Sequence, residues 1–177
     1  QKEYLLHMDV SRDDVFFYYS TCGWVMWNIL VSGLATGATL VLYDGSPFSP
    51  TPSVLIDMAE EEGITVFGGG AKYYASLEKF GVKPRETHDL SALKTILSTG
   101  SPLSEESYEY IYRDIKSDVC LSSISGGTDI ISAFVEGSPT LPVYSGELQC
   151  RGLGMAIEVW DDDGNSVVGE KGELVCV

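Results

Sequence analysis

The residues best suited to chemistry lie in one short segment, residues 122–129, which reads Ser-Ser-Ile-Ser-Gly-Gly-Thr-Asp. Its small residues allow a ligand to approach the backbone closely, and the hydroxyl of Thr128 is followed directly by the carboxylate of Asp129. This pair is suited to a phosphate and a magnesium ion, because magnesium prefers few carboxylates together with phosphate oxygens. A glycine turn capped by threonine or aspartate is a common alternative, so the segment alone leaves both interpretations open.

Two further segments have an unusual composition for connections. Residues 98–103, Ser-Thr-Gly-Ser-Pro-Leu, lie between an apolar run and a helical pattern, where backbone groups can meet a flat or anionic ligand. Residues 22–28, Cys-Gly-Trp-Val-Met-Trp-Asn, place bulky apolar side chains at the start of a predicted helix. The alternatives are an ordinary strand-to-helix turn for the first segment and core packing for the second.

Motifs of several other enzyme classes are absent. The sequence contains no G-x-x-x-x-G-K-[ST] phosphate loop, no G-x-S-x-G nucleophile elbow, no H-E-x-x-H and no G-x-G-x-x-G. Hydrolase and dehydrogenase interpretations therefore lose support.

Composition restricts the partners of the protein. Acidic residues outnumber basic ones by 26 to 11, and the net charge of −15 predicts no nucleic acid and no anionic membrane as partner. The four cysteines lie far apart without Cys-x-x-Cys spacing, so we expect reduced core thiols and no zinc site. With no secretory signal and no apolar run long enough to span a bilayer, a soluble protein of the reducing cytoplasm is expected.

Hydrophobic patterning predicts an α/β fold. Segments with helical spacing separate five apolar runs that are typical of strands, at residues 15–19, 38–43, 64–67, 93–97 and 119–122. We expect the first helix over residues 24–36, ending near Gly37, and the second to have Thr51 as its cap and Pro52 at its first position. A parallel β-α-β series follows, and ligands bind such sheets at the carboxyl ends of the strands.

The remainder of the chain is predicted to be rich in strands. Beyond residue 130, short strand-like runs include residues 155–160 and 166–168, on either side of the acidic turn at residues 161–165. That turn lacks the spacing of a calcium loop and is expected to be a solvated hairpin tip. One domain is therefore expected, with an α/β sheet region over about residues 1–130 and a β-rich region over about residues 131–177.

Taken in order, these segments resemble the adenylate-forming acyl-CoA synthetases, and the likeness covers the whole chain. The phrases that carry it are residues 14–28, 31–35, 42–47, 125–129, 140–144 and 146–149, which include Leu-Tyr-Asp-Gly-Ser-Pro and Ser-Gly-Gly-Thr-Asp. Within the family they are similar to the members that activate acetoacetate. The resemblance implies an internal part of the large N-terminal AMP-binding (adenylation) domain of such an enzyme.

An ATP-dependent acid–CoA ligase is the activity that the resemblance implies. The carboxylate of the acid attacks the α-phosphate of ATP to give an acyl-adenylate and pyrophosphate, and the thiol of CoA then displaces AMP to give the thioester. The implied ligands are ATP, Mg2+, CoA and a small carboxylic acid, in fatty acid and lipid metabolism. Magnesium would neutralise phosphate charge as it develops.

Site residues follow from the same resemblance, position by position. The implied ATP- and AMP-binding residues are Gly100, Ser101, Pro102, Ser123, Ile124, Ser125, Gly127 and Thr128. Thr128 matches the phosphate-contacting threonine and Asp129 the magnesium-linked acidic residue, so both are implied to be catalytic. Many relatives have glutamate at the position of Asp129, and the shorter side chain must reach the metal through a shifted backbone or a water. Gly70 matches the channel of the CoA pantetheine arm.

The resemblance also implies an acyl pocket, with Trp24, Val25 and Met26 as one wall. Gly126 stands where the similar acetyl-CoA synthetases have a tryptophan that closes the pocket. The glycine leaves room for a four-carbon keto acid, but also for butyrate or longer chains, because an apolar pocket discriminates each added methylene by only about 1–3 kcal/mol. No residue obviously recognises the 3-keto oxygen.

Several groups of the family are not found among these residues: a glycine- and serine-rich phosphate loop, a ribose-binding aspartate and a mobile C-terminal domain with its catalytic lysine. Residues 1–177 alone are therefore expected to be inactive, and self-association through exposed apolar edges is a further hypothesis. Two alternatives stay open. One is a short- or medium-chain acyl-CoA synthetase that shares Gly126, and the other is a non-catalytic, truncated AMP-binding module.

Overall fold

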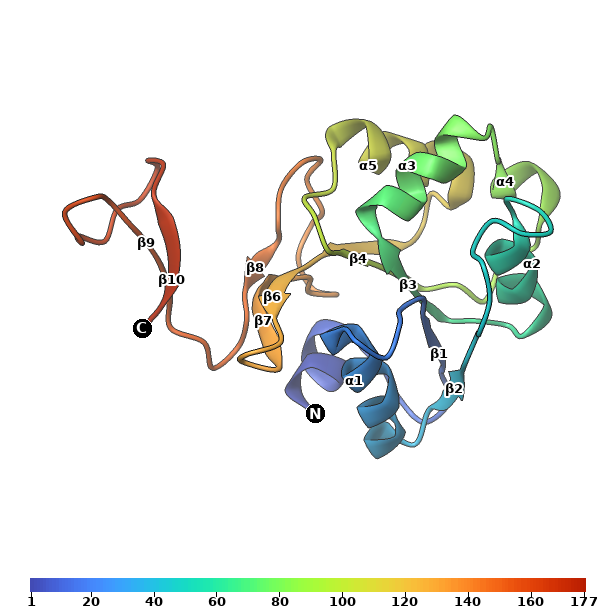
Figure 1. Ribbon diagram of the computed structural model, residues 1–177, viewed down its shortest axis with the longest axis horizontal. Coiled ribbons are helices and arrows are strands. Elements are labelled where there is room, and N and C mark those ends of the chain that lie inside the picture. Colours follow the sequence, from blue (N-terminus) through green and yellow to red (C-terminus); the bar gives the residue numbers. More distant parts are fainter.

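A parallel sheet forms the central layer of the computed structural model, which describes residues 1–177 (Figure 1). Its strand order is β2-β1-β3-β4-β5, and all four strand pairs are parallel. The strands are β1 (Val15–Tyr18), β2 (Thr39–Val41), β3 (Val66–Gly70), β4 (Thr95–Thr99) and β5 (Cys120–Ser123). The predicted α/β fold with a parallel sheet is confirmed.

Helices connect these strands and cover both faces of the sheet (Figure 1). They are η1 (Glu3–His7), α1 (Val25–Ser32), η2 (Gly33–Thr36), α2 (Val54–Glu61), α3 (Ala71–Lys79), α4 (Pro84–Thr87), α5 (Glu105–Tyr110) and η3 (Ile111–Ile115). The helices α2, α3 and α5 pack on one face, whereas η1 and α1 pack on the other. No helix has the length and apolar character needed to cross a membrane.

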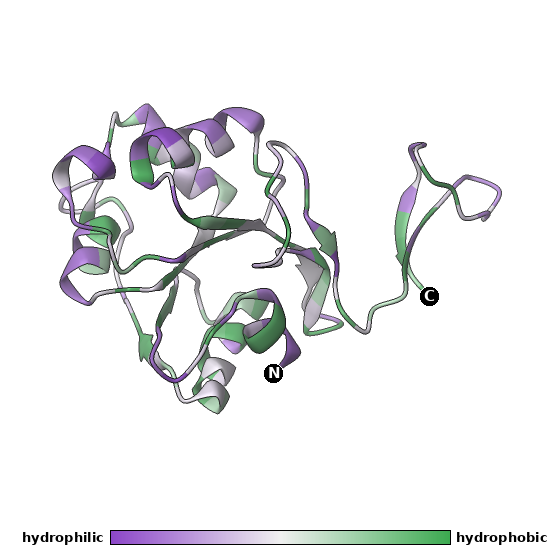
Figure 2. Ribbon diagram, turned by 180° about the vertical axis from the view of Figure 1, so that it is seen from behind, coloured by the Kyte–Doolittle hydropathy of each residue, from purple (hydrophilic) through white to green (hydrophobic).

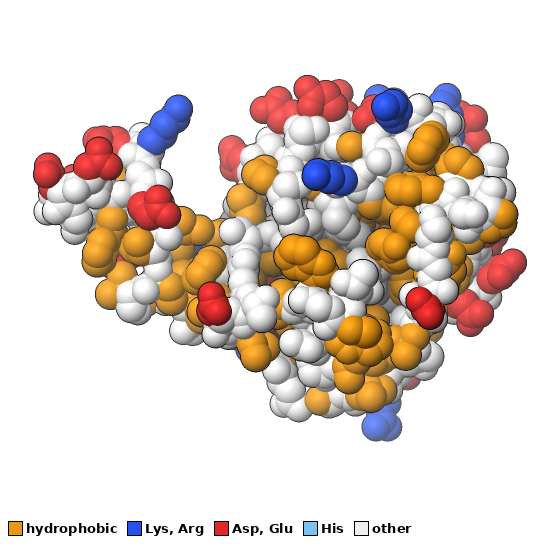
Figure 3. All heavy atoms as spheres, viewed as in Figure 1, with side chains coloured by type: hydrophobic (Ala, Val, Ile, Leu, Met, Phe, Trp, Pro, Cys, Tyr) orange, Lys and Arg blue, Asp and Glu red, His pale blue; other side chains and the backbone are white.

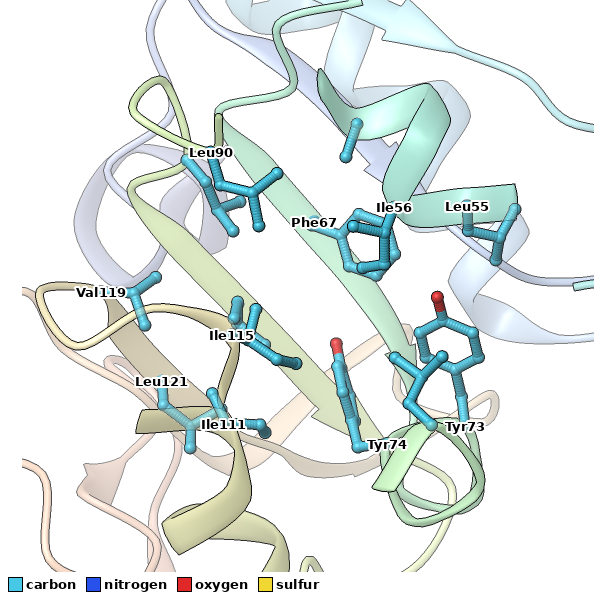
Figure 4. Packing of buried hydrophobic residues seen from close by; sticks show 14 of the residues in the cluster. Leu55, Ile56, Phe67, Tyr73, Tyr74, Leu90, Ile111, Ile115, Val119 and Leu121 are labelled. Atoms are coloured by element: carbon cyan, nitrogen blue, oxygen red, sulfur yellow. The ribbon is translucent and has the colours of Figure 1, made fainter. Parts of the chain in front are cut away.

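The strands β1, β3 and β4 each contribute buried residues to two hydrophobic cores, because successive side chains point to opposite faces. Phe17 and Ile96 pack with residues of α2, α3 and η3 in the larger core, part of which is seen in Figure 4. Their neighbours Phe16 and Leu97 pack with η1 and α1 on the other face. Hydrophobic colouring therefore runs along the strands, while several outer helices show hydrophilic faces (Figure 2). Burial on both faces explains why these strands are continuous apolar runs in the sequence.

After residue 123 every strand pair is antiparallel. The strands β6 (Ser125–Gly127), β7 (Ser132–Glu136) and β8 (Cys150–Arg151) form a second sheet. A hairpin of β9 (Ile157–Trp160) and β10 (Glu173–Cys176) extends away from the rest of the molecule (Figure 1). Acidic side chains gather over α5 and on this hairpin, while apolar side chains lie exposed on other parts of the same face (Figure 3).

The predicted end of the first helical segment is confirmed, whereas the predicted start of the second helix is wrong. The helical segment after β1 ends at Gly37, whose φ of 85° is in the left-handed region. However, α2 begins at Val54, so the assignment of Thr51 as its cap and Pro52 as its first residue is wrong. The carbonyl of Thr51 accepts the N–H of Val54 at 3.3 Å, which forms a separate turn ahead of the helix.

Three other expectations need correction. The strand expected at residues 64–67 is β3, which begins at Val66 and continues through Gly70, because the glycines at residues 68–70 continue the pairing with β4. Residues 166–168 form no strand: Ser166 makes an isolated bridge to Trp160, and the partner of β9 is β10. The four cysteines are free, as expected, but they are not core residues, since two are exposed and two are half-buried.

Asp14 links the starts of three strands through hydrogen bonds to its carboxylate. Its carboxylate accepts hydrogen bonds from the N–H of Ser11 at 2.8 Å, the hydroxyl of Thr65 at 2.8 Å and the ammonium of Lys94 at 2.9 Å. Asp14, Thr65 and Lys94 directly precede β1, β3 and β4. Burial alone would raise the pKa of Asp14, but these hydrogen bonds outweigh it and hold that pKa below its ordinary value.

Replacing Asp14 is expected to destabilise the fold. The variant Asp14→Ala should lower the free energy of unfolding by about 2–4 kcal/mol at neutral pH, because it leaves buried donors without their acceptor. The exposed neighbour provides a matched control, Asp13→Ala, with an expected change below about 0.5 kcal/mol.

The effect of Asp14 should also depend on pH. Because its pKa is lowered in the folded state, its contribution is present above the pKa of an unfolded aspartate and is lost as the pH falls through the folded value. Urea denaturation at neutral and acidic pH measures this. A difference between Asp14→Ala and the unmodified protein that stays constant into the acidic range would contradict the assignment.

Candidate active site

The carboxyl ends of β3, β4 and β5 lie side by side. The parallel register pairs Gly70 with Thr99 and Ser98 with Ser123. The N–H of Ile124 then donates to the carbonyl of Ser98 at 2.8 Å, and the hydroxyl of Thr99 donates to the carbonyl of Ile124 at 2.7 Å. The loops that follow these strands therefore open at one edge of the sheet, where such folds bind their ligands.

The loop after β4 contains the predicted adenine contacts Gly100, Ser101 and Pro102, all of which are exposed. Gly100 has a φ of 89°, and an added Cβ would have no atom within 4 Å. The loop ends where the side chain of Ser104 accepts the N–H of Ser107 at 3.3 Å and caps α5. A ligand can therefore reach the backbone of this loop without displacing a side chain.

The loop after β5 contains the other predicted nucleotide contacts. Ser123 is buried, Ile124 and Ser125 are half-buried, and Gly126 and Gly127 belong to β6. Thr128 and Asp129 are exposed in the turn between β6 and β7. No group of three or more acidic, histidine or cysteine side chains in the structure is placed so that it could hold a metal ion. The turn thus fits a magnesium ion that arrives with phosphate oxygens, and does not fit a metal cage made by the protein alone.

Gly70 ends β3 at the same edge of the sheet, directly before α3. A Cβ at this position would meet only the carbonyl of Thr99, at an ordinary contact distance of 3.7 Å. The position expected to border the CoA channel therefore lies next to the strand that carries the adenine loop.

A cavity lies at this end of the sheet, and three of the four predicted acyl-pocket residues, Val25, Met26 and Gly126, line it. With its open mouth it measures about 430 Å³. Its other lining residues are Glu3, Met8, Ile29, Thr99, Ile124, Gly127, Ser132, Ala133 and Glu136. The fourth predicted wall residue, Trp24, does not line the cavity, and 68% of its surface is exposed.

The two glycines of this cavity differ in what surrounds them. A Cβ on Gly126 would collide with the carbonyl oxygen of Ser132 and lie 2.8 Å from the Cα of Ala133, so β6 can approach β7 only with glycine here. A Cβ on Gly127 would have no atom within 4 Å. A side chain at position 126 would therefore meet the backbone of β7 before it reached the cavity, which gives this glycine a packing role besides the predicted opening of the pocket.

Two acidic residues that the sequence did not single out also line the cavity. Glu3 accepts the hydroxyl of Ser132 at 2.5 Å and lies 3.3 Å from the ammonium of Lys2. Burial alone would raise the pKa of Glu3, but these neighbours hold it below its ordinary value. Glu136 is 1% exposed, its Oε1 has no hydrogen-bond partner, and burial raises the pKa of this carboxyl to about 7. Neither residue belongs to a recognisable motif. A charged residue at the start of a helix or the end of a strand is usually solvated, so the sequence provided no reason to expect these two in a cavity.

The contrast between the two glycines generates a prediction about stability. Gly126→Ala should lower the free energy of unfolding by about 1–3 kcal/mol, because β7 must move away from the added methyl group. Gly127→Ala is the matched control, with an expected change within about 0.5 kcal/mol. Thermal denaturation of both variants measures the difference, and equal melting temperatures would contradict the tight approach of β6 to β7.

Comparison with known proteins agrees with this geometry. The family model described as AMP-binding enzyme matches residues 2–177. Acetoacetyl-CoA synthetase of Gallus gallus is 59% identical over 175 residues, covering 99% of this chain and 26% of that protein. Malonamoyl-CoA synthetase of Penicillium aethiopicum is 44% identical over 191 residues, covering 99% of this chain and 26% of that protein.

A solved structure shows the same fold. Acetoacetyl-CoA synthetase from Streptomyces lividans matches with a TM-score of 0.93 and 44% identity, covering 99% of this chain and 28% of that chain. The chain spans about a quarter of the length of the relatives that it matches. The resemblance read from the sequence is thereby confirmed, and because the family model matches nearly every residue, the chain belongs to the AMP-binding enzyme family.

Proposed function

We propose that this chain is part of an AMP-forming acid–CoA ligase that activates acetoacetate. The observation that carries the proposal is the cavity lined by Val25, Met26 and Gly126, which lies beside the loops after β4 and β5. A largely apolar cavity next to an exposed hydroxyl and carboxylate suits a small acid that must meet a nucleotide phosphate. The 59% identity to an acetoacetyl-CoA synthetase supports this substrate.

The proposed roles follow from where the side chains lie. The apolar part of the acid packs against Val25, Met26 and Ile29. Its carboxylate faces the turn with Thr128, whose hydroxyl donates to a phosphate oxygen, and Asp129, which holds the magnesium ion. That ion neutralises negative charge on the phosphates when it is bound. Each reactant is thus placed by a different element, and orientation supplies much of the rate enhancement in such a reaction.

The remaining ligands are proposed for the neighbouring loops. The adenine of ATP lies against residues 100–102, beside residues 123–125 and Gly127, and the pantetheine arm of CoA enters past Gly70. All of these ligands are small molecules. The net charge of −15 argues against nucleic acid and anionic lipid surfaces as partners, and the cytoplasm is the proposed compartment.

A second candidate substrate is malonamate, because one relative is a malonamoyl-CoA synthetase. Malonamate and acetoacetate have chains of equal length with a carbonyl group at the third carbon. Malonamate has an amide nitrogen where acetoacetate has a methyl group. The cavity lining includes Met8, Met26 and Ile29, which suit a methyl group, and the identity to the malonamoyl-CoA synthetase is lower, at 44% against 59%. Acetoacetate is therefore the first choice.

Pyrophosphate exchange with the full-length protein tests the proposal. With ATP and magnesium, kcat/KM for acetoacetate should exceed that for acetate, butyrate and malonamate by about tenfold or more. Acetate leaves part of the cavity empty, butyrate lacks the carbonyl group at the third carbon, and malonamate places an amide against Met8, Met26 and Ile29. Preference for butyrate would keep the chemistry but move the substrate to the short- or medium-chain acids. No exchange with any acid would favour a non-catalytic AMP-binding module.

Residues 1–177 alone are expected to form no thioester above a control without protein. The reason is that the mobile domain with the catalytic lysine, implied by the family, is not among these residues. The measurement is thioester formation from acetoacetate, ATP and CoA, with the full-length protein as the positive control. Turnover by the 177-residue chain would show that its own side chains suffice for both steps.

A further inference from the structure

We propose that Glu136 selects acids with a carbonyl group at the third carbon, by donating a hydrogen bond from its un-ionised carboxyl to that carbonyl oxygen. The inference rests on the proposed function, because it takes the cavity to be the acyl pocket. It adds a residue that touches the substrate at the end opposite to the reacting carboxylate.

The position of Glu136 is unusual for a charged residue type. It ends β7, lines the cavity and is 1% exposed. No protein group donates a hydrogen bond to its carboxyl, and its Oε1 is enclosed without a partner. A buried polar group without a partner costs free energy unless a ligand supplies the partner.

His7 is the nearest ionisable neighbour, and its hydrogen bonds fix it as a neutral ring. Its Nδ1 lies 2.7 Å from the carbonyl oxygen of Gly137, so Nδ1 carries the proton and donates. The N–H of Leu153 donates to Nε2 at 3.1 Å, so Nε2 carries none. Although Nε2 is 3.3 Å from Oε1 of Glu136, it has no proton to offer a carboxylate there. His7 therefore does not stabilise the ionised form of Glu136.

The other ionisable groups near Glu136 leave its charge unbalanced. Burial is the main influence and raises its pKa to about 7, with Lys2 acting in the opposite direction and Glu3 acting in the same direction. The ammonium of Lys2 lies next to Glu3, at 3.3 Å, where it is already matched with a carboxylate. Cys150, which pairs with Glu136 across β7 and β8, carries a thiol whose own pKa burial raises. Below neutral pH, Glu136 is thus a hydrogen-bond donor.

No other side chain in the cavity has a proton to donate. The hydroxyl of Thr99 donates to the carbonyl of Ile124 at 2.7 Å. The hydroxyl of Ser132 donates to Glu3, which is itself an ionised acceptor. The remaining lining side chains are apolar or absent. Glu136 is the one side chain left to recognise an oxygen atom of the acid.

The charge state of Glu136 decides what the cavity accepts. The un-ionised carboxyl donates to a carbonyl oxygen, whereas a carboxylate would repel both that oxygen and the anionic substrate. A saturated acid such as butyrate leaves the buried donor unpaired, and sites of this kind reject such analogues strongly. The cavity therefore separates acetoacetate from butyrate by polarity and not by size.

Two substitutions in the full-length protein test this role, with pyrophosphate exchange as the assay. Glu136→Met keeps the volume but removes the donor, and should lower kcat/KM for acetoacetate by about 10- to 100-fold while butyrate changes by less than about threefold. Glu136→Gln keeps a donor without a titratable group, and should retain acetoacetate activity within about fivefold. Glu170→Met removes an exposed carboxyl far from the cavity lining and is the matched control, with no change in either rate.

The pH profile gives a second readout that a purely structural role would not produce. The preference of the unmodified protein for acetoacetate over butyrate should fall as the pH rises from about 6 to about 8.5, because the donor form of a carboxyl with a raised pKa is lost with rising pH. In Glu136→Gln the preference should stay constant over the same range.

The outcomes separate this inference from the proposed function. If the unmodified protein exchanges pyrophosphate with acetoacetate but Glu136→Met keeps its ratio of acetoacetate to butyrate, the inference is overturned and the function stands. If the unmodified protein shows no exchange with any acid, the proposed function fails, and with it the inference. Equal melting temperatures of the variants show that a lost rate is not lost folding.

Discussion

Contact between β1 and β3 determines where the candidate site residues lie. Tyr18 pairs with Gly68, and its ring covers this glycine so closely that no side chain fits there. The Tyr18 hydroxyl also donates to the carbonyl of Gly69 at 3.2 Å. With β1 in this register, α1 follows at the edge where β3, β4 and β5 end, and Val25 and Met26 reach the cavity beside the loop after β5. Gly68 is thus a condition for the site, although it is not itself one of the candidate site residues.

The order of the elements could be predicted from the sequence because the parallel strands are buried on both faces. Pairs such as Phe16 and Phe17 supply one side chain to each core, which makes a strand a continuous apolar run. Helix boundaries were harder to predict where a local turn competes with the first turn of the helix. At Thr51, for example, the carbonyl oxygen accepts a hydrogen bond that closes a turn before α2. The pairing of β9 with β10 was missed because the residues between them, 161–172, offered a nearer apolar run at residues 166–168.

The candidate site could be predicted only in part, for a physical reason. Its loops follow strand ends, and small residues with a hydroxyl and a carboxylate are visible in the sequence. Glu136 was not predicted, because its burial depends on partners far away in the chain: His7 lies 3.3 Å from its Oε1, and Gly152 leaves the space that this oxygen fills. Gly126 was interpreted as an opening, whereas the approach of Ser132 and Ala133 also requires it. Contacts of long sequence separation leave no local pattern.

The two ends of the substrate meet opposite environments. At the mouth, Thr128 and Asp129 are exposed, where charge is solvated and phosphate oxygens can enter. At the inner end, Glu136 is buried with no counter-charge of its own. This arrangement costs the empty protein about 1–3 kcal/mol for the unmade hydrogen bond. A methionine there would avoid this cost and fill the same volume. Such a local violation of packing rules is expected at functional positions, and the cost is recovered only by a ligand that brings an acceptor into the cavity.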